Sequence, residues 1–481
     1  MAAITLVALL LRLPGLDDSV FGDELFTYEI ATRPGFGDML DGVTGPLEIS
    51  PPLYFVFAWL GAKIGDPQLW VRVPAMVAGV ATVPALYALG LRTLGRPAAL
   101  AGAACLALSP FATFYSTEAR AYTLTALLLV LTVLALVSAL EEGGWWRWGL
   151  FAAAAWAALF SHYTAVFVLA AAVGWAAWTR RDRLRELALA CAAVAVGLLP
   201  WLPSFLDDRT AGFQTAIENV SPLTGSFFVR SLGIAVVGNP YVGLRELPGW
   251  PVLVLLAAGL LLALAGAVAL HERLRVDSRV ALIAALALAT PIGAALYSIP
   301  FTSVYVPRTL TASLPAFCLL LGYLLTRPRL RIAVPATALV VAALAIGTFE
   351  AYGENPKPPY REAAQFINER TRPGDPVIQL GLLVDYGSLD VQLEKPFRLY
   401  KQFCERPVTD GGQIITAEVR CSGQDPLERV VREAPRRIMV VTYGSPGRID
   451  LPGLAENLRL AQVRRFGHAR FPLEVREYAR R

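Results

Sequence analysis

Apolar runs long enough to cross a lipid bilayer recur through the first 350 residues, and they restrict the fold more than any other feature. TLTALLLVLTVLALVSAL and PVLVLLAAGLLLALAGAVAL are two of them, each close to the roughly 20 residues that a spanning helix needs. The chain is 55% hydrophobic and 17% charged, which is too apolar for an ordinary soluble protein. The sequence therefore predicts an α-helical polytopic membrane protein.

Short arginine-rich loops between the runs predict the orientation. Arg92 and Arg96 lie in one loop and further arginines crowd the segment 180–185, so the positive-inside rule makes both loops cytoplasmic. The N-terminus is then inside, the C-terminus is outside the plasma membrane, and the polar stretch 207–249 is an external loop. We expect eleven spans, at about 3–11, 73–91, 97–115, 121–140, 148–161, 163–178, 187–206, 250–270, 280–298, 309–326 and 332–349.

The first of these segments is short. Residues 3–11 are apolar, but Arg12 ends them well before a span is complete, which leaves open whether Met1 is the natural start. A cleaved signal peptide is the alternative, but there is no basic n-region and no clear small-residue cleavage site. Two short helices are expected next, near 24–31 and 52–62, and the second is expected to lie along the outer leaflet.

A second domain is predicted after the last span, where the composition becomes that of a soluble protein. The linker ENPKPPY leads into a helical pattern, REAAQFINER, and then into short strand-like runs such as PVIQL and RRIMVVTY. We therefore divide the chain into a transmembrane domain, 1–349, and a small extracytoplasmic α/β module, 350–481. In that oxidising compartment Cys404 and Cys421 are expected to form a disulfide.

The net charge of +5 does not indicate nucleic-acid binding, because the arginines are spread over the short loops that membrane topology requires. Membrane lipids are therefore the expected partners of these basic loops. The sequence contains neither a GxGxxG pattern nor a Walker loop, so we expect no nucleotide-binding fold.

Charged and polar residues that are unusual beside a membrane gather on the expected external side. The acidic stretch Gly22-Asp23-Glu24-Leu25 follows the first segment. Each residue has an ordinary explanation, since acids suit helix N-termini, neighbouring charges can pair and arginines snorkel to headgroups. Together they offer a base and guanidinium groups at the water–lipid boundary, as sugar transfer from a lipid phosphate requires. The other members of the set, placed where spans leave or re-enter the membrane, are Glu118, Arg120, Tyr122, His162, Tyr163 and Arg308.

These motifs resemble the GT-C glycosyltransferases that use polyprenyl-phosphate sugars, in the family 39-like branch of protein O-mannosyltransferases and aminoarabinose transferases. GDELFTYE resembles that family's Asp-Glu motif, and SPPLYFVF its Pro-Pro-Leu stretch. STEARAYTL, FSHYTAVF and VPRTLTASLP resemble its Glu-Ala-Arg-x-Tyr segment, its His-Tyr turn and its arginine before a late span. Two positions depart from the pattern: Ser50 stands where many relatives have His, and Thr309 where Tyr is usual.

The resemblance implies an inverting single displacement. Asp23 would be the catalytic base that deprotonates an acceptor hydroxyl, and Arg308, with Arg120 as a second candidate, would stabilise the departing phosphate. Glu24 and Glu118 would position sugar hydroxyls or those arginines. The donor would be a polyprenyl-phosphate sugar, with a mannose-like hexose favoured, and the acceptor a glycan, a lipid or a protein. The remaining candidates for substrate binding are Tyr122, His162 and Tyr163.

Two other classes of protein fit part of the pattern. A lipid-linked glycan flippase would also have many spans, but its polar residues should lie at mid-membrane depth rather than cluster at one face. An inactive family member that acts as an assembly subunit would not need Asp23 and Arg308 intact. Metal dependence stays open, and Asp23, Glu24 and His162 would be the first ligands to test for a divalent cation.

The arginine loops generate a topological prediction. A reporter that is active only in the cytoplasm, fused after Arg481, should be silent in cells that insert the protein. The same reporter fused within the 180–185 loop should be active, and a signal from the C-terminal fusion would reverse the predicted orientation.

Overall fold

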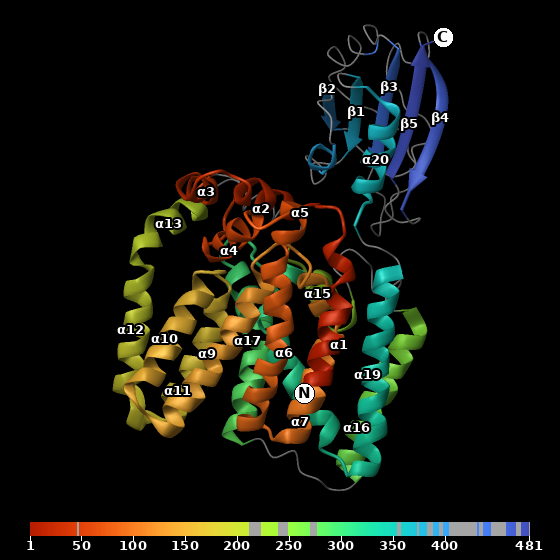
Figure 1. Cartoon of the computed structure of the whole chain (residues 1–481). Helices are drawn as coiled ribbons and strands as arrows, with labels where there is room; N and C mark the ends of the chain where they lie inside the picture. The colour runs from red at the N-terminus through yellow and green to blue at the C-terminus, as the bar shows by residue number, and fades with distance from the viewer. Residues whose placement is uncertain are drawn as a thin grey trace. The chain divides into compact units, whose positions relative to one another are not determined.

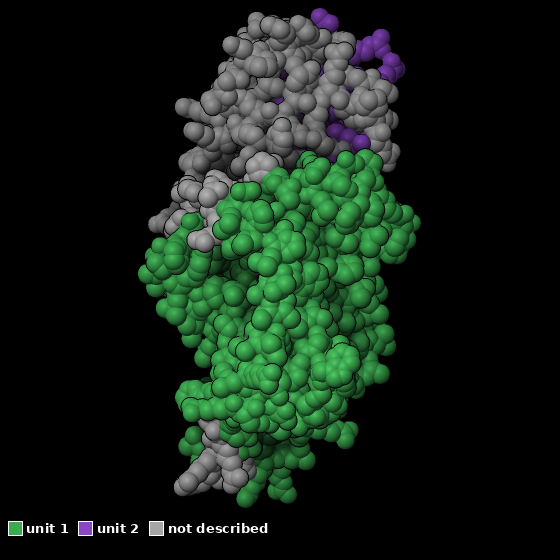
Figure 2. Space-filling model, turned by 90° about the vertical axis from the view of Figure 1, so that its left-hand side faces the viewer, with its two compact units in different colours: residues 1–16, 26–351 green, residues 17–25, 352–481 purple. Residues whose placement is uncertain are grey.

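The structure, a computed structural model, divides into two compact units, shown in green and purple in Figure 2. Unit 1 consists of residues 1–16 and 26–351, and unit 2 of residues 17–25 and 352–481. Unit 1 is a bundle of α-helices, and unit 2 contains a β-sheet (Figure 1). The structure describes residues 1–45, 48–210, 223–238, 249–269, 277–353, 357–372, 375–381, 388–393, 398–403, 431, 436–443, 458–467 and 473–480.

A helix lies at each of the expected spans, so the prediction of a multi-pass helical membrane protein is confirmed. Within the described ranges, 6 stretches are both long and apolar enough to cross a bilayer: Pro67–Thr93, Tyr122–Glu142, Arg181–Asp207, Trp250–Val268, Ser278–Ser298 and Leu330–Tyr352. The total of eleven stays a prediction, because several of the other helices have no more than 15 residues. The helices at the expected spans are α1 (Ala2–Arg12), α6 (Val73–Thr93), α7 (Arg96–Leu108), α8 (Pro110–Tyr115), α9 (Tyr122–Glu142), α10 (Trp145–Leu159), α11 (Ala165–Thr179), α12 (Leu184–Leu198), α16 (Gly249–Ala269), α17 (Ser278–Ser298), α18 (Leu314–Thr326) and α19 (Leu330–Gly353).

Short helices fill the connections between the long ones. The helix expected near 52–62 is present as α4, which is packed through the fully buried Tyr54 and Ala58. The hydroxyl of Tyr54 donates a hydrogen bond to the backbone oxygen of Val71 at 2.8 Å. The short helices are η1 (Pro14–Leu16), α2 (Glu24–Ala31), α3 (Phe36–Val43), α4 (Leu53–Ala62), α5 (Pro67–Trp70), η2 (Arg181–Arg183), η3 (Leu199–Trp201), α13 (Leu202–Thr210), α15 (Gly225–Val237) and η4 (Pro307–Ala312).

The stretch 207–249 was expected to be a polar loop, and this expectation is wrong in part. It contains helix α15, which begins where the hydroxyl of Thr224 accepts a hydrogen bond from the backbone N–H of Phe227 at 3.1 Å. That bond satisfies one of the N–H groups that every helix leaves unpaired at its start. The run FFVRSLGIAVV is apolar enough to pack, as the buried Ile234 and Ala235 show.

The expected span 97–115 is two helices, because Ser109 and Pro110 interrupt it. Proline disfavours a helical conformation in the residue before it, and Ser109 is extended, with ψ at 122°. The Ser109 hydroxyl then accepts a hydrogen bond from the N–H of Ala112 at 3.2 Å, which starts α8. The turn that follows α8, residues 116–121, therefore lies buried within the bundle.

Arg12, which ends the first apolar run, is completely buried in the last turn of α1. Its Nε donates to the Oγ of Ser116 at 2.9 Å, and its Nη1 donates to the backbone oxygen of Ala107 at 3.2 Å. A buried guanidinium needs such acceptors because it cannot lose its charge. Arg12 thus connects α1 to the end of α7 and to the turn after α8.

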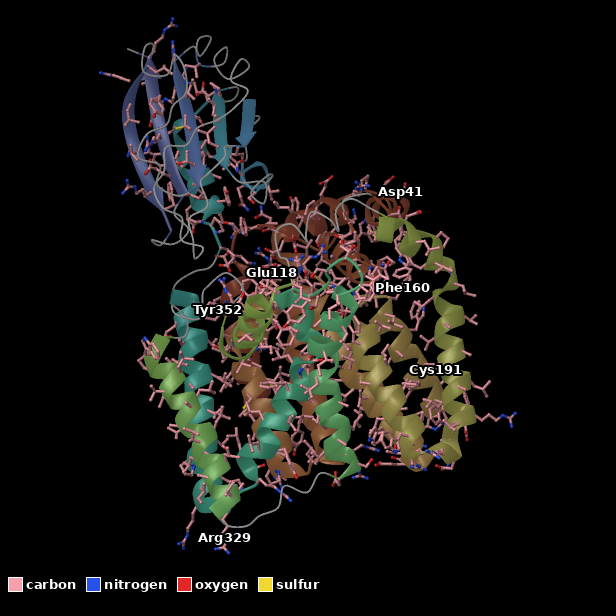
Figure 3. The ribbon with its side chains drawn as sticks, turned by 180° about the vertical axis from the view of Figure 1, so that it is seen from behind. Asp41, Glu118, Phe160, Cys191, Arg329 and Tyr352 are labelled. Atoms are coloured by element: carbon pink, nitrogen blue, oxygen red, sulfur yellow. The ribbon has the colours of Figure 1, made fainter. Side chains whose placement is uncertain are left out.

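Arginine-rich loops and the candidate residue Glu118 lie toward opposite ends of the helical bundle (Figure 3). Arg329 lies at one end, while Glu118 and Phe160 lie toward the other. Ion pairs join helices in the arginine-rich loops, where Arg92 contacts Glu142 at 2.9 Å and Arg279 contacts Glu141 at 2.8 Å. The arginine loops and the candidate site residues are therefore separated along the length of the helices.

Unit 2 contains a five-stranded mixed sheet in the order β2-β1-β3-β5-β4. β1 pairs in parallel with β2 and β3, whereas β5 pairs antiparallel with β3 and β4. Helix α20 (Tyr360–Arg370) covers one face, because its apolar residues share a core with β1, β3 and β5 (Figure 1). The predicted α/β module is confirmed, whereas Cys404 and Cys421 lie outside the described residues. The strands are β1 (Pro376–Gly381), β2 (Arg398–Phe403), β3 (Arg437–Tyr443), β4 (Leu458–Phe466) and β5 (Leu473–Arg480).

Candidate functional site

Arg120 lies in the buried turn between α8 and α9, where it forms a bidentate ion pair with Glu48. Its Nη1 lies 2.6 Å from one carboxylate oxygen of Glu48, and its Nη2 lies 3.0 Å from the other. The Arg120 guanidinium also donates to the hydroxyls of Thr27 at 3.4 Å and Ser50 at 3.2 Å, and it lies over the ring of Phe55. Two parallel N–H···O hydrogen bonds of this kind are the favoured geometry between a guanidinium and a carboxylate.

The ion pair involves an acidic residue that was not among the sequence candidates, Glu48. Glu48 is only 2% exposed, and one of its oxygens also accepts the backbone N–H groups of Ile49 and Ser50, so its charge is held in place. Arg120 therefore has a carboxylate partner at Glu48, whereas pairing with Glu118 was one of the alternatives that the sequence left open. Sequence reasoning missed Glu48, although an acid two residues before Ser-Pro-Pro in an apolar context was an available signal.

His162 lies in the turn between α10 and α11 with its imidazole neutral. Its Nδ1 accepts the backbone N–H of Thr164 at 3.3 Å and lies 2.8 Å from the Thr164 hydroxyl. Burial and the positive charges of Arg120 and Arg308 lower the pKa of His162 to about 3. Because Nδ1 is an acceptor, the proton of the neutral ring is on Nε2, which makes His162 a hydrogen-bond donor there.

The two expected tyrosines contact different neighbours. Tyr122, the first residue of α9, is buried with its ring 5.7 Å from the ring of His162. Tyr163 points elsewhere: its hydroxyl accepts a hydrogen bond from the indole N–H of Trp201 at 3.0 Å, and its ring packs edge-on against Phe205. Tyr122 thus belongs to the His162 cluster, and Tyr163 to an aromatic group beside it.

Arg308 lies in η4, which begins at Pro307, and it is half-buried. Its backbone oxygen accepts the hydroxyl of Thr311 at 2.7 Å, which holds the turn. Arg308 is close enough to His162 to lower the pKa of the imidazole. Glu118 is buried in the same turn as Arg120 and its backbone oxygen accepts the N–H of Arg120 at 2.7 Å. Unit 1 therefore brings together Arg120, Tyr122, His162 and Arg308, which are far apart in the sequence.

An apolar cavity of about 420 Å³ adjoins this cluster. Thr164, the hydrogen-bond partner of His162, and the neighbouring Tyr163 are both part of its wall, so the cavity begins one residue away from His162 in the chain. A volume of this size suits a chain of apolar groups. The lining residues are Leu159, Phe160, Tyr163, Thr164, Val166, Phe167, Leu198, Trp201, Leu202, Phe205, Tyr297 and Val304.

The acidic stretch 22–25 belongs to unit 2. Gly22 has a φ of 61°, in the left-handed region that favours glycine, and it forms a turn in which the N–H of Leu25 reaches the oxygen of Gly22 at 3.1 Å. Asp23 is the second residue of this turn and leads into α2. Glu24, expected to position sugar hydroxyls or arginines, forms a buried ion pair with Lys357 at 2.9 Å. No group of three His, Cys, Asp or Glu side chains is arranged as a metal site in the part of the chain that the structure describes.

The neutral His162 generates a prediction about pH. In the unfolded chain the imidazole takes up a proton below about pH 6.5, whereas in the folded protein it does so only near pH 3. Acidification from pH 7.5 to pH 5 should therefore favour unfolding, by at most about 2 kcal/mol from this group. Thermal unfolding of His162→Gln should lose this part of the pH dependence, and an unchanged dependence would show that the imidazole is not held neutral.

Comparisons with known proteins agree with this geometry. Residues 50–206 match the sequence profile of the dolichyl-phosphate-mannose-protein mannosyltransferase family, PMT_2. A search of curated protein sequences finds no match. The apo structure of ArnT from Cupriavidus metallidurans superposes with a TM-score of 0.58 at 14% identity, covering 99% of this chain and 97% of ArnT.

Two further solved structures share the fold. ArnT from Cupriavidus metallidurans bound to undecaprenyl phosphate gives a TM-score of 0.56 at 15% identity, over 98% of this chain and 97% of that one. The oligosaccharyltransferase AglB from Archaeoglobus fulgidus, in complex with an inhibitory peptide and a dolichol-phosphate, gives 0.50 at 12% identity, over 91% and 68%. The resemblance predicted from the sequence is thus confirmed: the chain has the GT-C glycosyltransferase fold, and residues 50–206 carry the sequence pattern of the PMT_2 family.

Proposed function

We propose that this protein is a membrane glycosyltransferase that moves a sugar from a polyprenyl-phosphate donor to an acceptor hydroxyl on the extracytoplasmic side. The observation that carries the proposal is the cluster of Arg308, Arg120 and His162 beside an apolar cavity, whose wall includes Thr164, the hydrogen-bond partner of His162. Such a site presents hydrogen-bond donors and positive charge to a headgroup and apolar surface to a lipid chain. The family match over residues 50–206 supports the same class of reaction.

The cavity suits the lipid part of such a donor. Its wall is built from aromatic and aliphatic side chains, with few polar groups. Burial of an isoprenoid unit there would be favoured by the hydrophobic effect, at about 25 cal/mol for each Å² of apolar surface removed from water. Undecaprenyl phosphate in one ArnT structure and dolichol-phosphate in the AglB structure are lipids of this kind.

Arg308 is the best candidate for the phosphate. Arg120 forms a bidentate ion pair with Glu48, so it holds the site together, whereas Arg308 lies in η4 and is close enough to His162 to affect its charge. The Nε2–H of a neutral His162 would donate a further hydrogen bond to a phosphate oxygen. Charge that develops on the phosphate as the sugar leaves is stabilised most by donors that are already oriented.

Asp23 is proposed as the general base, on the strength of its place in the Asp-Glu motif. An ionised carboxylate accepts the proton of the acceptor hydroxyl as oxygen attacks the anomeric carbon, and the lipid phosphate departs from the opposite face. The sugar configuration is inverted by this single displacement. A mannose-like hexose is the favoured sugar because of the PMT_2 family match, and a glycan, a lipid or a protein hydroxyl would accept it.

The role of Arg308 generates a prediction about the donor. Arg308→Lys should lower the transfer rate about 10-fold with a polyprenyl-phosphate sugar, because a lysine cannot reproduce two-pronged contact with phosphate oxygens. Purified variants in liposomes, assayed by product mass, measure this. Arg331→Lys, an exposed arginine on α19, is the matched control and should keep the wild-type rate. Full activity of Arg308→Lys would reduce Arg308 to a membrane anchor.

The role of Asp23 generates a second prediction. Asp23→Asn should lower sugar transfer by about 10²- to 10⁴-fold while the protein still folds and inserts, because asparagine keeps the shape of aspartate but cannot accept the proton. Asp41→Asn, an exposed acid on α3, is the control and should transfer sugar at the wild-type rate. Wild-type turnover by Asp23→Asn would contradict the proposed function, and a flippase would form no glycosidic bond with either protein.

A further inference from the structure

Residues 17–25 lie near the N-terminus, yet they are an integral part of unit 2. The side chain of Phe21 is only 6% exposed and belongs to the same apolar core as Tyr360 and Phe366 of α20 and Val377 of β1. Burial of a phenylalanine side chain is among the larger single contributions to a small core. The module beyond residue 352 is therefore built around a segment from the other end of the chain.

Polar contacts hold the same segment from both sides of Phe21. The backbone N–H of Arg361 donates to the hydroxyl of Ser19 at 3.0 Å, and the Arg361 guanidinium pairs with Asp17. Both contacts join residues separated by more than 300 positions in the sequence. They fix the path of the chain up to the turn at Gly22.

Lys357 makes the most buried of these contacts. Its Nζ lies 2.9 Å from a carboxylate oxygen of Glu24, and the two side chains are 2% and 0% exposed. Pro358 and Pro359 follow Lys357, and their fixed φ angles restrict the backbone between Lys357 and the start of α20. A buried ion pair is a poor source of net stability, but loss of one partner leaves an uncompensated charge, so the pair specifies one arrangement.

We propose that Lys357 is a positioning residue for sugar transfer. Through the ion pair with Glu24, Lys357 holds the Gly22-Asp23 turn, and with it the carboxylate that acts as the base. The inference rests on the proposed role of Asp23, which is the residue directly before Glu24. It gives Glu24 a structural partner in place of the sugar contact expected from the sequence.

The physical argument is one of geometry. Glu24 is the first residue of α2, and Asp23 has the left-handed Gly22 on its other side, so anchoring Glu24 leaves the Asp23 backbone little freedom. A reacting group displaced by about 1 Å can lose about 10²-fold in rate. Without the ammonium, the Glu24 carboxylate would lose its ion pair at 2.9 Å, and the Asp23 turn would be held less firmly.

The test is a double-mutant cycle on full-length enzyme, with Glu24→Gln, Lys357→Met and the double variant. Each single variant should lower kcat, per folded molecule, by about 10- to 100-fold, while KM for the polyprenyl-phosphate donor changes less than about twofold. The double variant should be no slower than the slower single variant, because the two side chains act as one unit. Arg437→Met, which breaks the Arg437–Glu477 pair of the same unit, is the control and should keep the wild-type kcat.

Three results would overturn the inference. They are a folded Lys357→Met enzyme with wild-type kcat, single-variant losses that multiply in the double variant, and a loss confined to the amount of folded protein. If Lys357→Met alone does not fold, the double variant, which buries no lone charge, decides: a reduced kcat supports the inference and a wild-type kcat refutes it. Asp23→Asn separates the two hypotheses. If Asp23→Asn is active, the proposed function is wrong. If Asp23→Asn is inactive but Lys357→Met is fully active, only the positioning role of Lys357 is wrong.

Discussion

A charged side chain inside an apolar bundle is tolerated only where protein groups replace the water it has lost. In unit 1 this constraint determines how the connections between helices are built. The Nε and Nη1 of Arg12 donate to Ser116 and to backbone oxygens, and Arg120 pairs with the carboxylate of Glu48. Both arginines reach the turn that follows α8, so this short buried segment is held by α1 on one side and by residues 48–50 on the other.

The same constraint separates the roles of the two arginines near His162. Arg120 is paired with a carboxylate that also accepts two backbone N–H groups, which fixes the position of the pair. Burial, together with the positive charges of Arg120 and Arg308, lowers the pKa of His162 to about 3. With Nδ1 accepting the N–H of Thr164, the neutral imidazole carries its proton on Nε2, where it can donate a hydrogen bond.

Unit 2 shows that a domain is defined by its core and not by continuity of the chain. Phe21 completes the core under α20, and Lys357, Arg361 and Ser19 tie the first loop to the linker and the helix. The segment that carries the Asp-Glu motif thus supplies part of the apolar surface that unit 2 buries.

The sequence alone determined the class of the protein and the positions of its helices. Apolar runs of span length and loops rich in arginine are local patterns, and so are the alternating patterns of REAAQFINER, PVIQL and RRIMVVTY, which became α20, β1 and β3. Ordered motifs were enough to identify the GT-C resemblance and to select Arg120, Tyr122, His162 and Arg308 as one group. Helix α15 was not predicted from the sequence, because its apolar run is interrupted by Arg230 and surrounded by polar residues.

Only the tertiary structure decided which charges pair. Pairing of Arg120 with Glu118, two residues away, was one possibility from the sequence, and the structure shows an ion pair of Arg120 with Glu48, 72 positions earlier. The partner of Glu24 is Lys357, 333 positions later. Pairing of buried charges depends on which side chains meet when distant segments pack, and sequence spacing carries no information about that meeting. For the same physical reason the first loop could not be assigned to the C-terminal module from sequence, because the core that joins them exists only when both have folded together.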